Sequence, residues 1–259
     1  MAIVWNKVTW YSKLLAVILF VAIFFVGFQL GKEKTEIISN DNATPEKQVE
    51  KSVVPISIKK MDLKEENFSG TVPTISGSSA LAKEAQKYVE ESIALFRTQA
   101  NTDVPDMKAR FGADSPTATY TIDLSATSIK SKKTQSIILS AYTYTGGAHG
   151  NSSYKVITAD TSSGKILSLS DVVKKEEESA FTSFVQKELN SWRPAGSDAS
   201  VIFPDEVKNL SFGSFLDWSL DDKNLIIYFD QYEIGPGVLG AVAFPLPLEK
   251  IKNFLKLGF

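Results

Sequence analysis

The sequence predicts an α+β fold with antiparallel sheets and helices packed on one face, preceded by one N-terminal transmembrane helix. Three observations support this prediction. A run of 18 uncharged residues lies near the N-terminus, several later stretches alternate apolar and polar residues, and two stretches repeat apolar residues every three or four positions. The 43% hydrophobic content of the 259 residues is sufficient for a sizeable core, and packing helices on sheets is a stable way to bury it.

The uncharged run, residues 14–31, reads LLAVILFVAIFFVGFQLG. At a rise of about 1.5 Å per residue, a helix of this length spans roughly 27 Å, enough to cross the apolar core of a bilayer. Lys7 and Lys13 favour a cytoplasmic location for residues 1–13. A cleaved signal peptide is the alternative, although no A-x-A-like cleavage site follows the run. We therefore expect a single-pass cell-membrane protein whose C-terminal domain is extracytoplasmic.

The chain after the apolar run is expected to have three parts. Residues 32–52 are polar and charged with little periodic apolar content, which predicts a flexible stalk. A first α+β part should follow at residues 53–170, and a second at residues 171–259. The first part is predicted to open with a strand at residues 53–60 and an irregular lead-in at residues 68–76.

A helix and a meander of strands should complete the first part. From Leu81 onward, apolar or small residues recur at helical spacing, behind the candidate N-caps Ser78 and Ser79. Residues 118–128 alternate apolar and polar side chains, as half-buried strands do. Further strands are predicted on either side of a glycine-rich turn and after a Ser-Gly turn, at residues 135–145, 154–160 and 166–169. Their order suggests an antiparallel meander.

The second part is predicted to begin with another amphipathic helix. Ser170 and Asp171 are candidate caps, and Pro194 with Gly196 should end the helix. Its apolar face consists of Phe181, Phe184, Val185, Leu189 and Trp192. Three short strands and a terminal helix are expected to follow, at residues 211–219, 224–232, 240–246 and 248–257.

Composition excludes several kinds of chemistry. The chain has no cysteine and one histidine, so it holds no disulfide, no thiolate metal site, no cysteine nucleophile and no multi-histidine metal site within one chain. After the apolar run, acidic residues outnumber basic ones, which argues against nucleic acid as a partner. We expect neither a cofactor nor a metal.

The string YTYTGGAHG at residues 142–150 is a candidate binding loop. Glycines permit positive φ angles and close backbone approach, so a loop of this kind can orient a histidine. The alternative is that the histidine only pins a bulge by bonding a neighbouring strand. No G-x-S-x-G nucleophile elbow lies nearby. The candidate ligand-binding residues of this string are Tyr142, Tyr144, Gly146, Gly147 and His149.

The string YFDQYEIGPG at residues 228–237 ends a predicted strand in a tight turn. Asp230, Tyr232 and Glu233 offer polar and aromatic edges to a sugar or a protein. The alternative is that they are ordinary residues of a strand end. The two carboxylates resemble a glycosidase pair only weakly, because such a pair needs a defined separation in space.

The two strings, with VPTISG at residues 72–77 before them and TSSGK at residues 161–165 between them, resemble a bacterial envelope domain family of unknown function. The family includes the extracellular, lysozyme-binding region of the anti-sigma factor RsiV and the accessory N-terminal domain of the peptidoglycan deacetylase PdaC. The resemblance covers about residues 53–259 and implies a two-part α+β ectodomain. The family's pattern is matched by Tyr144, Gly146, Gly147, His149, Tyr232 and Glu233.

The leading hypothesis is a membrane-anchored, extracytoplasmic binding module for a cell-wall polymer or a wall-acting protein such as lysozyme. We favour a non-enzymatic protein, and the 13 residues ahead of the apolar run predict no RsiV-style sigma-binding segment. One alternative is a hydrolase of wall glycan or peptide, with His149, Asp230 and Glu233 converging in one cleft. Another is a structural interaction domain with an extensive exposed apolar patch.

Overall fold

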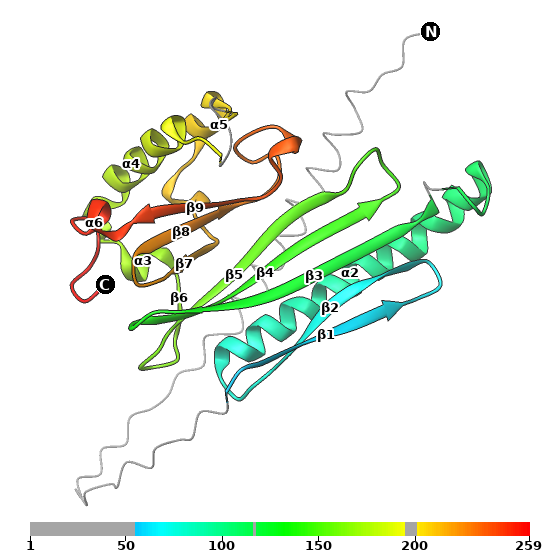
Figure 1. The fold of residues 1–259 in the computed structure, drawn as a ribbon, viewed down its shortest axis with the longest axis horizontal. Helices are drawn as coiled ribbons and strands as arrows, with labels where there is room; N and C mark the ends of the chain where they lie inside the picture. Colours follow the sequence, from blue (N-terminus) through cyan, green and yellow to red (C-terminus); the bar gives the residue numbers. More distant parts are fainter. Residues whose placement is uncertain (1–54, 116–117, 195–200) are drawn as a thin grey trace, which may run out of the picture. The chain divides into compact units, whose positions relative to one another are not determined.

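The computed structural model describes residues 55–115, 118–194 and 201–259 (Figure 1). Residues 51–259 form one compact unit, and every described core residue lies within it. We therefore expect this unit to fold on its own. The predicted cytoplasmic tail, transmembrane helix and stalk lie outside the described residues. Among the described residues, no helix has the length and apolar content needed to cross a membrane.

Six strands form the first sheet, and they lie in chain order. The strands β3 to β5 form the predicted antiparallel meander. The lead-in predicted to be irregular at residues 68–76 is instead strand β2, because it pairs with β1 along its length. The neighbours β2 and β3 are parallel, since a long helix carries the chain back between them. The strands are β1 (Ser57–Lys64), β2 (Phe68–Ser76), β3 (Tyr120–Lys130), β4 (Thr134–Thr145), β5 (Asn151–Asp160) and β6 (Ile166–Leu167).

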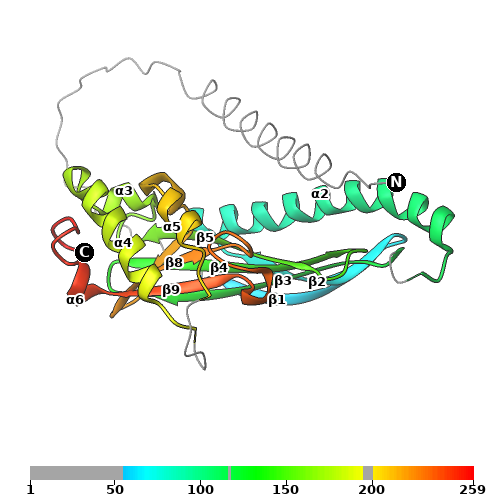
Figure 2. The same cartoon turned by 90° about the horizontal axis from the view of Figure 1, so that it is seen from above.

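The long helix α2 (Ala80–Phe111) covers one face of this sheet (Figure 2). Its N-cap is Ser79, whose Oγ accepts a hydrogen bond from the Ala82 N–H at 3.2 Å. Of the stripe predicted from Leu81 onward, Ala85 and Phe96 are buried against the sheet with Leu81, whereas Tyr88 and Ser92 are half-buried. Phe96 meets Phe68 of β2 edge-on at a centroid distance of 5.3 Å. This helix and the inner face of the sheet form the first hydrophobic cluster.

The second part contains a three-stranded antiparallel sheet of β7 (Trp218–Leu220), β8 (Asn224–Phe229) and β9 (Val242–Pro247). Helix α4 (Glu178–Ser191) buries Phe181, Val185 and Leu189 in a second hydrophobic cluster, as the sequence predicted. The part also contains the short helices α3 (Leu169–Val172), α5 (Pro204–Asn209) and α6 (Leu248–Ile251).

Several boundaries in the second part differ from the prediction. The single helix predicted between Ser170 and Pro194 is broken into α3, a 3-10 turn at Lys175–Glu177 and α4. Ser168, rather than Ser170, forms a capping box with Asp171 at the start of α3. Residues 212–214 form a 3-10 turn, so the strand predicted at residues 211–219 is reduced to β7. The terminal helix ends at Ile251 because the chain beyond it pairs with residues 172–174 through backbone hydrogen bonds and a bridge to Leu255.

The two sheets meet on the face of the first sheet opposite α2. Ile138 of β4, Val156 of β5 and Tyr228 of β8 form a small buried cluster there. Buried polar groups accompany it: the Thr158 hydroxyl donates to the Trp218 carbonyl at 2.7 Å, and the Thr134 hydroxyl donates to the Leu220 carbonyl at 3.2 Å. These hydrogen bonds fix how the second sheet sits on the first.

Candidate ligand-binding groove

The loop between β4 and β5 holds the first candidate string. Gly146 has a φ of 79°, which favours glycine. A Cβ atom at Gly150 would lie 2.2 Å from Cζ of Tyr142, so only glycine lets this ring lie against the loop backbone. Tyr144 is half-buried on β4, and Gly147 is exposed at the tip of the loop. The glycines therefore let the loop pack closely on Tyr142 and leave His149 at the surface.

The turn after β8 holds the second candidate string. Tyr232 has a φ of 73° and is the one non-glycine residue with a positive φ in the described part of the chain. The turn is closed by the Asp230 N–H, which donates to Oε2 of Glu233 at 2.8 Å. A Cβ atom at Gly237 would lie 2.3 Å from the Tyr232 hydroxyl oxygen. The Tyr232 ring therefore rests over a glycine, as the Tyr142 ring does.

A hydrogen bond joins the two strings. Nε2 of His149 and the Tyr232 hydroxyl lie 2.9 Å apart, and Nδ1 of His149 lies 2.9 Å from the Gly150 carbonyl oxygen. A carbonyl can only accept, so Nδ1 carries the proton in the neutral ring and Nε2 accepts from the Tyr232 hydroxyl. His149 thus links its own loop to the turn of the second part rather than pinning a strand bulge.

These residues surround a groove of about 490 Å³. Tyr142 is 43% exposed, Tyr232 50% and Val238 92%, so the walls offer two aromatic rings and an aliphatic side chain to a ligand. Backbone and polar groups of the loop and the turn supply hydrogen-bonding capacity. The lining residues of the two strings and their neighbours are Tyr142, His149, Gly150, Ser152, Gln231, Tyr232, Gly237, Val238, Leu239 and Gly240.

The predicted residues Asp230 and Glu233 do not line this groove. Oδ1 of Asp230 accepts from the Tyr154 N–H of β5 at 2.8 Å, and Glu233 closes the turn. Two further side chains of the second part also accept hydrogen bonds from β5 backbone N–H groups. Oε1 of Gln231 accepts from the Ser152 N–H at 2.8 Å, and Oδ1 of Asp217 accepts from the Val156 N–H at 2.6 Å. Three side chains of the second part therefore cap alternate N–H groups along the open edge of β5.

The pKa values of both predicted carboxyls are raised. Burial raises the pKa of Glu233 to about 7, and the nearby carboxylates of Asp230 and Asp217 add to the effect, although the Asp230 N–H opposes it. Burial by the surrounding protein also raises the pKa of Asp230. The hydrogen bond from the Tyr154 N–H opposes this rise, because it favours the ionised carboxylate, and the side chain is partly open to solvent. Both carboxylates accept backbone hydrogen bonds within the fold. These bonds oppose the rise in pKa, which burial causes.

The structure separates the side chains predicted for a hydrolase. His149 reaches the groove without Asp230 or Glu233, so the three side chains named for a hydrolase do not converge there. Its Nε2 faces the Tyr232 hydroxyl rather than a serine or threonine nucleophile. Across residues 55–115, 118–194 and 201–259, no group of three or more His, Asp or Glu side chains could hold a metal ion. The arrangement is suited to binding through aromatic and backbone groups.

Several groove residues were not singled out from the sequence. Gln231 joins β5 to the turn, since its Nε2 also donates to the Gly237 carbonyl at 2.8 Å. Val238 and Leu239 follow the Gly-Pro-Gly turn and carry no pattern of their own. Their only sequence signal was their place beside a glycine-rich string.

Two family models match different stretches of the chain. A family model described as Deacetylase PdaC matches residues 60–152, and one described as Protein of unknown function (DUF3298) matches residues 170–249. The peptidoglycan-N-acetylmuramic acid deacetylase PdaC of Bacillus subtilis is 26% identical over 128 residues, which is 48% of this chain and 27% of PdaC. The chain thus spans little more than a quarter of that relative.

A second relative matches over a longer stretch. The anti-sigma-V factor RsiV of Bacillus subtilis is 24% identical over 233 residues, covering 83% of this chain and 78% of RsiV. Two crystal structures of DUF3298 family proteins share the fold. The one from Bacteroides fragilis has a TM-score of 0.54 at 15% identity and covers 78% of this chain and 94% of its own. The one from Pseudomonas aeruginosa has a TM-score of 0.53 at 20% identity, with coverages of 79% and 95%.

The resemblance predicted from the two strings is therefore confirmed: the chain is similar to PdaC over its first part, to the DUF3298 family over its second, and to RsiV over most of its length.

Proposed function

We propose that this protein is a non-catalytic, extracytoplasmic binding module of the bacterial cell envelope, anchored in the membrane through residues 14–31. Its ligand is a cell-wall polymer or a wall-acting protein such as lysozyme. The binding surface is the groove between the loop of His149 and the turn of Tyr232. The similarity to PdaC, whose name refers to peptidoglycan, and to RsiV supports an envelope ligand.

The observation that carries the proposal is the His149–Tyr232 hydrogen bond of 2.9 Å. It unites two strings that lie more than eighty residues apart, one from each part of the fold. The groove beside it exposes aromatic and aliphatic side chains, whereas the carboxylates of Asp230 and Glu233 are engaged with β5 and with the turn backbone, respectively. A preorganised surface of this kind supports binding, because its rings and loops lose little conformational freedom when a ligand arrives.

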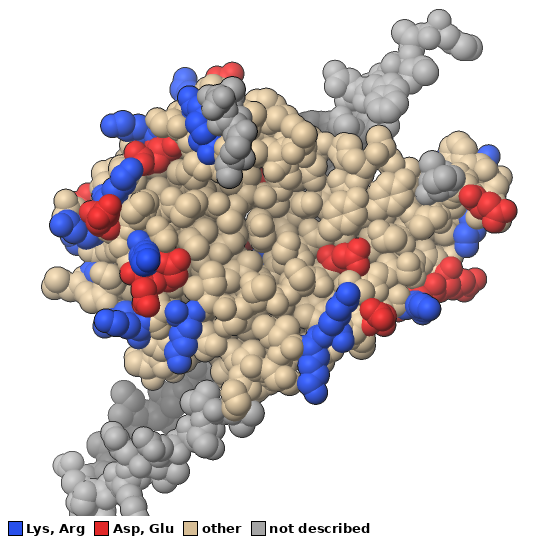
Figure 3. All heavy atoms as spheres, in the orientation of Figure 1, with Lys and Arg blue, Asp and Glu red and all other residues tan. Residues whose placement is uncertain are grey.

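The charge distribution is compatible with such a ligand. On the face shown in Figure 3, basic and acidic side chains are interspersed, mostly toward the margins. The described part of the face drawn there carries no large cluster of Lys and Arg of the kind on which phosphate binding depends.

The test is calorimetric titration of residues 51–259 with hen lysozyme and, separately, with soluble peptidoglycan fragments. We expect saturable binding to one of them, and we expect His149→Ala to weaken it by about tenfold, which corresponds to about 1.4 kcal/mol. Circular dichroism of the variant checks that it remains folded. If the folded wild-type unit binds neither lysozyme nor the fragments, the proposed function is wrong.

A further inference from the structure

The strands β2 and β3 separate after a short parallel pairing. Their register runs from Phe68 opposite Tyr120 to Thr71 opposite Asp123 and then stops, while β3 continues to Lys130. Gly70 marks the closest approach, since a Cβ atom there would lie 1.8 Å from the Ile122 carbonyl oxygen. Beyond this point the strands diverge, and a groove of about 540 Å³ opens between the β1–β2 hairpin and β3. We refer to this groove as the wedge.

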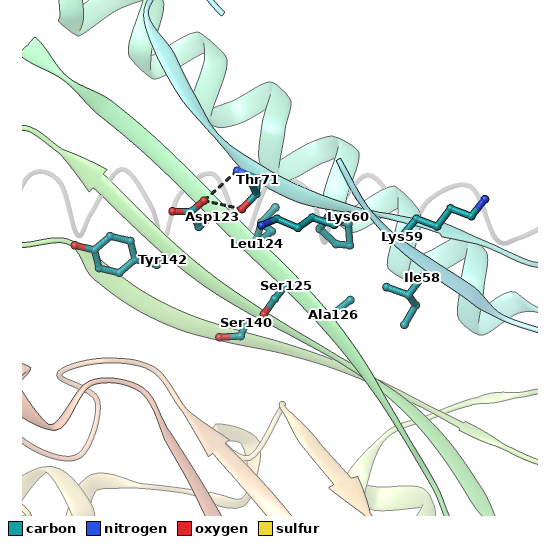
Figure 4. A pocket seen from close by; sticks show the side chains of 11 residues that line it. Ile58, Lys59, Lys60, Thr71, Asp123, Leu124, Ser125, Ala126, Ser140 and Tyr142 are labelled. Atoms are coloured by element: carbon teal, nitrogen blue, oxygen red, sulfur yellow. Dashed lines mark hydrogen bonds between the residues drawn. The ribbon is translucent and has the colours of Figure 1, made fainter. Parts of the chain in front are cut away.

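Apolar and polar side chains both line the wedge (Figure 4). Ile58, Leu124 and Ala126 line it and also belong to, or pack against, the hydrophobic cluster under α2. Polar groups also line the wedge, among them Lys60 and Asp123, and the Asp123 carboxylate accepts two hydrogen bonds from Thr71. No ion pair to Lys60 occurs among the residues that the structure describes, so its ammonium group is available to an anionic partner.

The wedge exposes an unpaired backbone edge. Residues 124–128 of β3 pair with β4 on one side, but within the described chain no strand is paired with their other side. On the β2 wall, the Ile75 N–H is capped by Oε1 of Gln86 at 2.7 Å. No comparable cap of the backbone at residues 124–128 is found in the described part of the molecule. This stretch of β3 therefore keeps backbone groups that another strand can satisfy.

The outer edge of the sheet is protected in a way that this inner edge is not. The edge strand β1 reads SIKKMDLK, with three lysines and an aspartate, and charges of this kind discourage pairing with another chain. Residues 124–128 read LSATS, with neither charge nor proline. Their alternating side chains, apolar toward the core and polar toward solvent, fit the half-buried surface of a paired strand.

We propose that the wedge binds an extended peptide segment of a partner protein, which adds as a strand to residues 124–128 of β3. The peptide's backbone supplies the hydrogen bonds, its alternate apolar side chains contact Ile58, Leu124 and Ala126, and an acidic side chain faces Lys60. This site is separate from the groove at His149, although Tyr142 lines both. The proposal therefore stands independently of the proposed function.

The probe is a synthetic peptide of about six residues, the usual length of a strand, that alternates valine with threonine and glutamate. Two N-methylated versions accompany it, one blocked at alternate amides and the other at the remaining amides. We expect the unmodified peptide to bind residues 51–259 and to slow amide hydrogen exchange at residues 124–128. One N-methylated version should bind about tenfold or more weakly and the other almost normally, because only one set of amides faces β3.

A variant of the protein gives a second readout. Lys60→Glu should weaken peptide binding by about fivefold or more through charge repulsion, whereas Lys64→Glu, on the same strand outside the wedge, should leave it unchanged. Equal weakening by both N-methylated peptides, or no protection of residues 124–128, overturns the proposal. So does protection of these amides by an N-acetylglucosamine oligomer in place of the peptide, which would make the wedge a saccharide site.

Discussion

Replacement of Glu233 by glutamine should make the protein more stable at neutral and higher pH. Burial and the neighbouring carboxylates raise the pKa of Glu233 from 4.5 to about 7 in the folded protein. Between these values the folded state holds a proton that the unfolded chain has released, so the free energy of unfolding falls as pH rises. Glutamine removes the titration and keeps an oxygen to accept from the Asp230 N–H, which Glu233 contacts at 2.8 Å.

The size of the effect follows from the pKa shift. A shift from 4.5 to about 7 corresponds to an upper limit of about 3 kcal/mol, and solvent screening of a partly exposed side chain reduces this to roughly 1 to 2 kcal/mol. Below about pH 5 the glutamate is protonated in the folded state, so variant and wild type should be nearly equal there. At about pH 8 the Glu233→Gln variant should be more stable by the stated amount.

Urea unfolding of residues 51–259, followed by the fluorescence of Trp192 and the buried Trp218, measures this difference. Glu84→Gln, an exposed position on α2, is the matched control and should show no pH-dependent gain. If the stability curves of Glu233→Gln and wild type run parallel from about pH 5 to about pH 8, Glu233 does not titrate in this range and the reasoning fails.

Substitutions at three further positions have expected outcomes. Gly237→Ala should displace the Tyr232 ring, because the added Cβ would lie 2.3 Å from the Tyr232 hydroxyl oxygen. We expect the free energy of unfolding to fall by about 1 kcal/mol and ligand affinity, measured by calorimetry, to fall by about tenfold. Gly70→Ala should cost more than about 3 kcal/mol of unfolding free energy, because its Cβ would collide with the Ile122 carbonyl, and unchanged urea stability would contradict this. Asp217→Ala should cost about 2 to 3 kcal/mol by leaving a β5 N–H uncapped, whereas Asp217→Asn, which keeps an acceptor, should cost less; equal losses would argue against the cap.

Local patterns predicted much of the fold. Helical spacing of apolar residues identified α2 and α4, and period-two alternation identified β3, because each pattern depends on one face being buried. The sequence did not reveal that β2 is a strand. Its parallel pairing with β3 joins residues more than fifty positions apart across a helix, and no local pattern records such a partner.

The candidate site was predictable only in part. The two glycine-rich strings drew attention to His149 and Tyr232, which the structure brings together at 2.9 Å. The carboxylates of Asp230 and Glu233 stood in the same string but face β5 and the turn backbone. Sequence alone does not separate a groove wall from a strand cap, because both uses require polar residues at a strand end.

The central claim is that the groove beside His149 and Tyr232 is the ligand-binding surface. It is tested most directly by comparing two exposed aliphatic residues, Val238 in the groove, which is 92% exposed, and Leu216 outside it, which is 70% exposed. Both Val238→Asp and Leu216→Asp should leave the fold intact. Calorimetric titration with whichever of lysozyme or peptidoglycan fragments binds the wild type should show affinity reduced by at least about tenfold for Val238→Asp and unchanged for Leu216→Asp. Unchanged affinity in Val238→Asp, or an equal loss in both variants, would contradict the account.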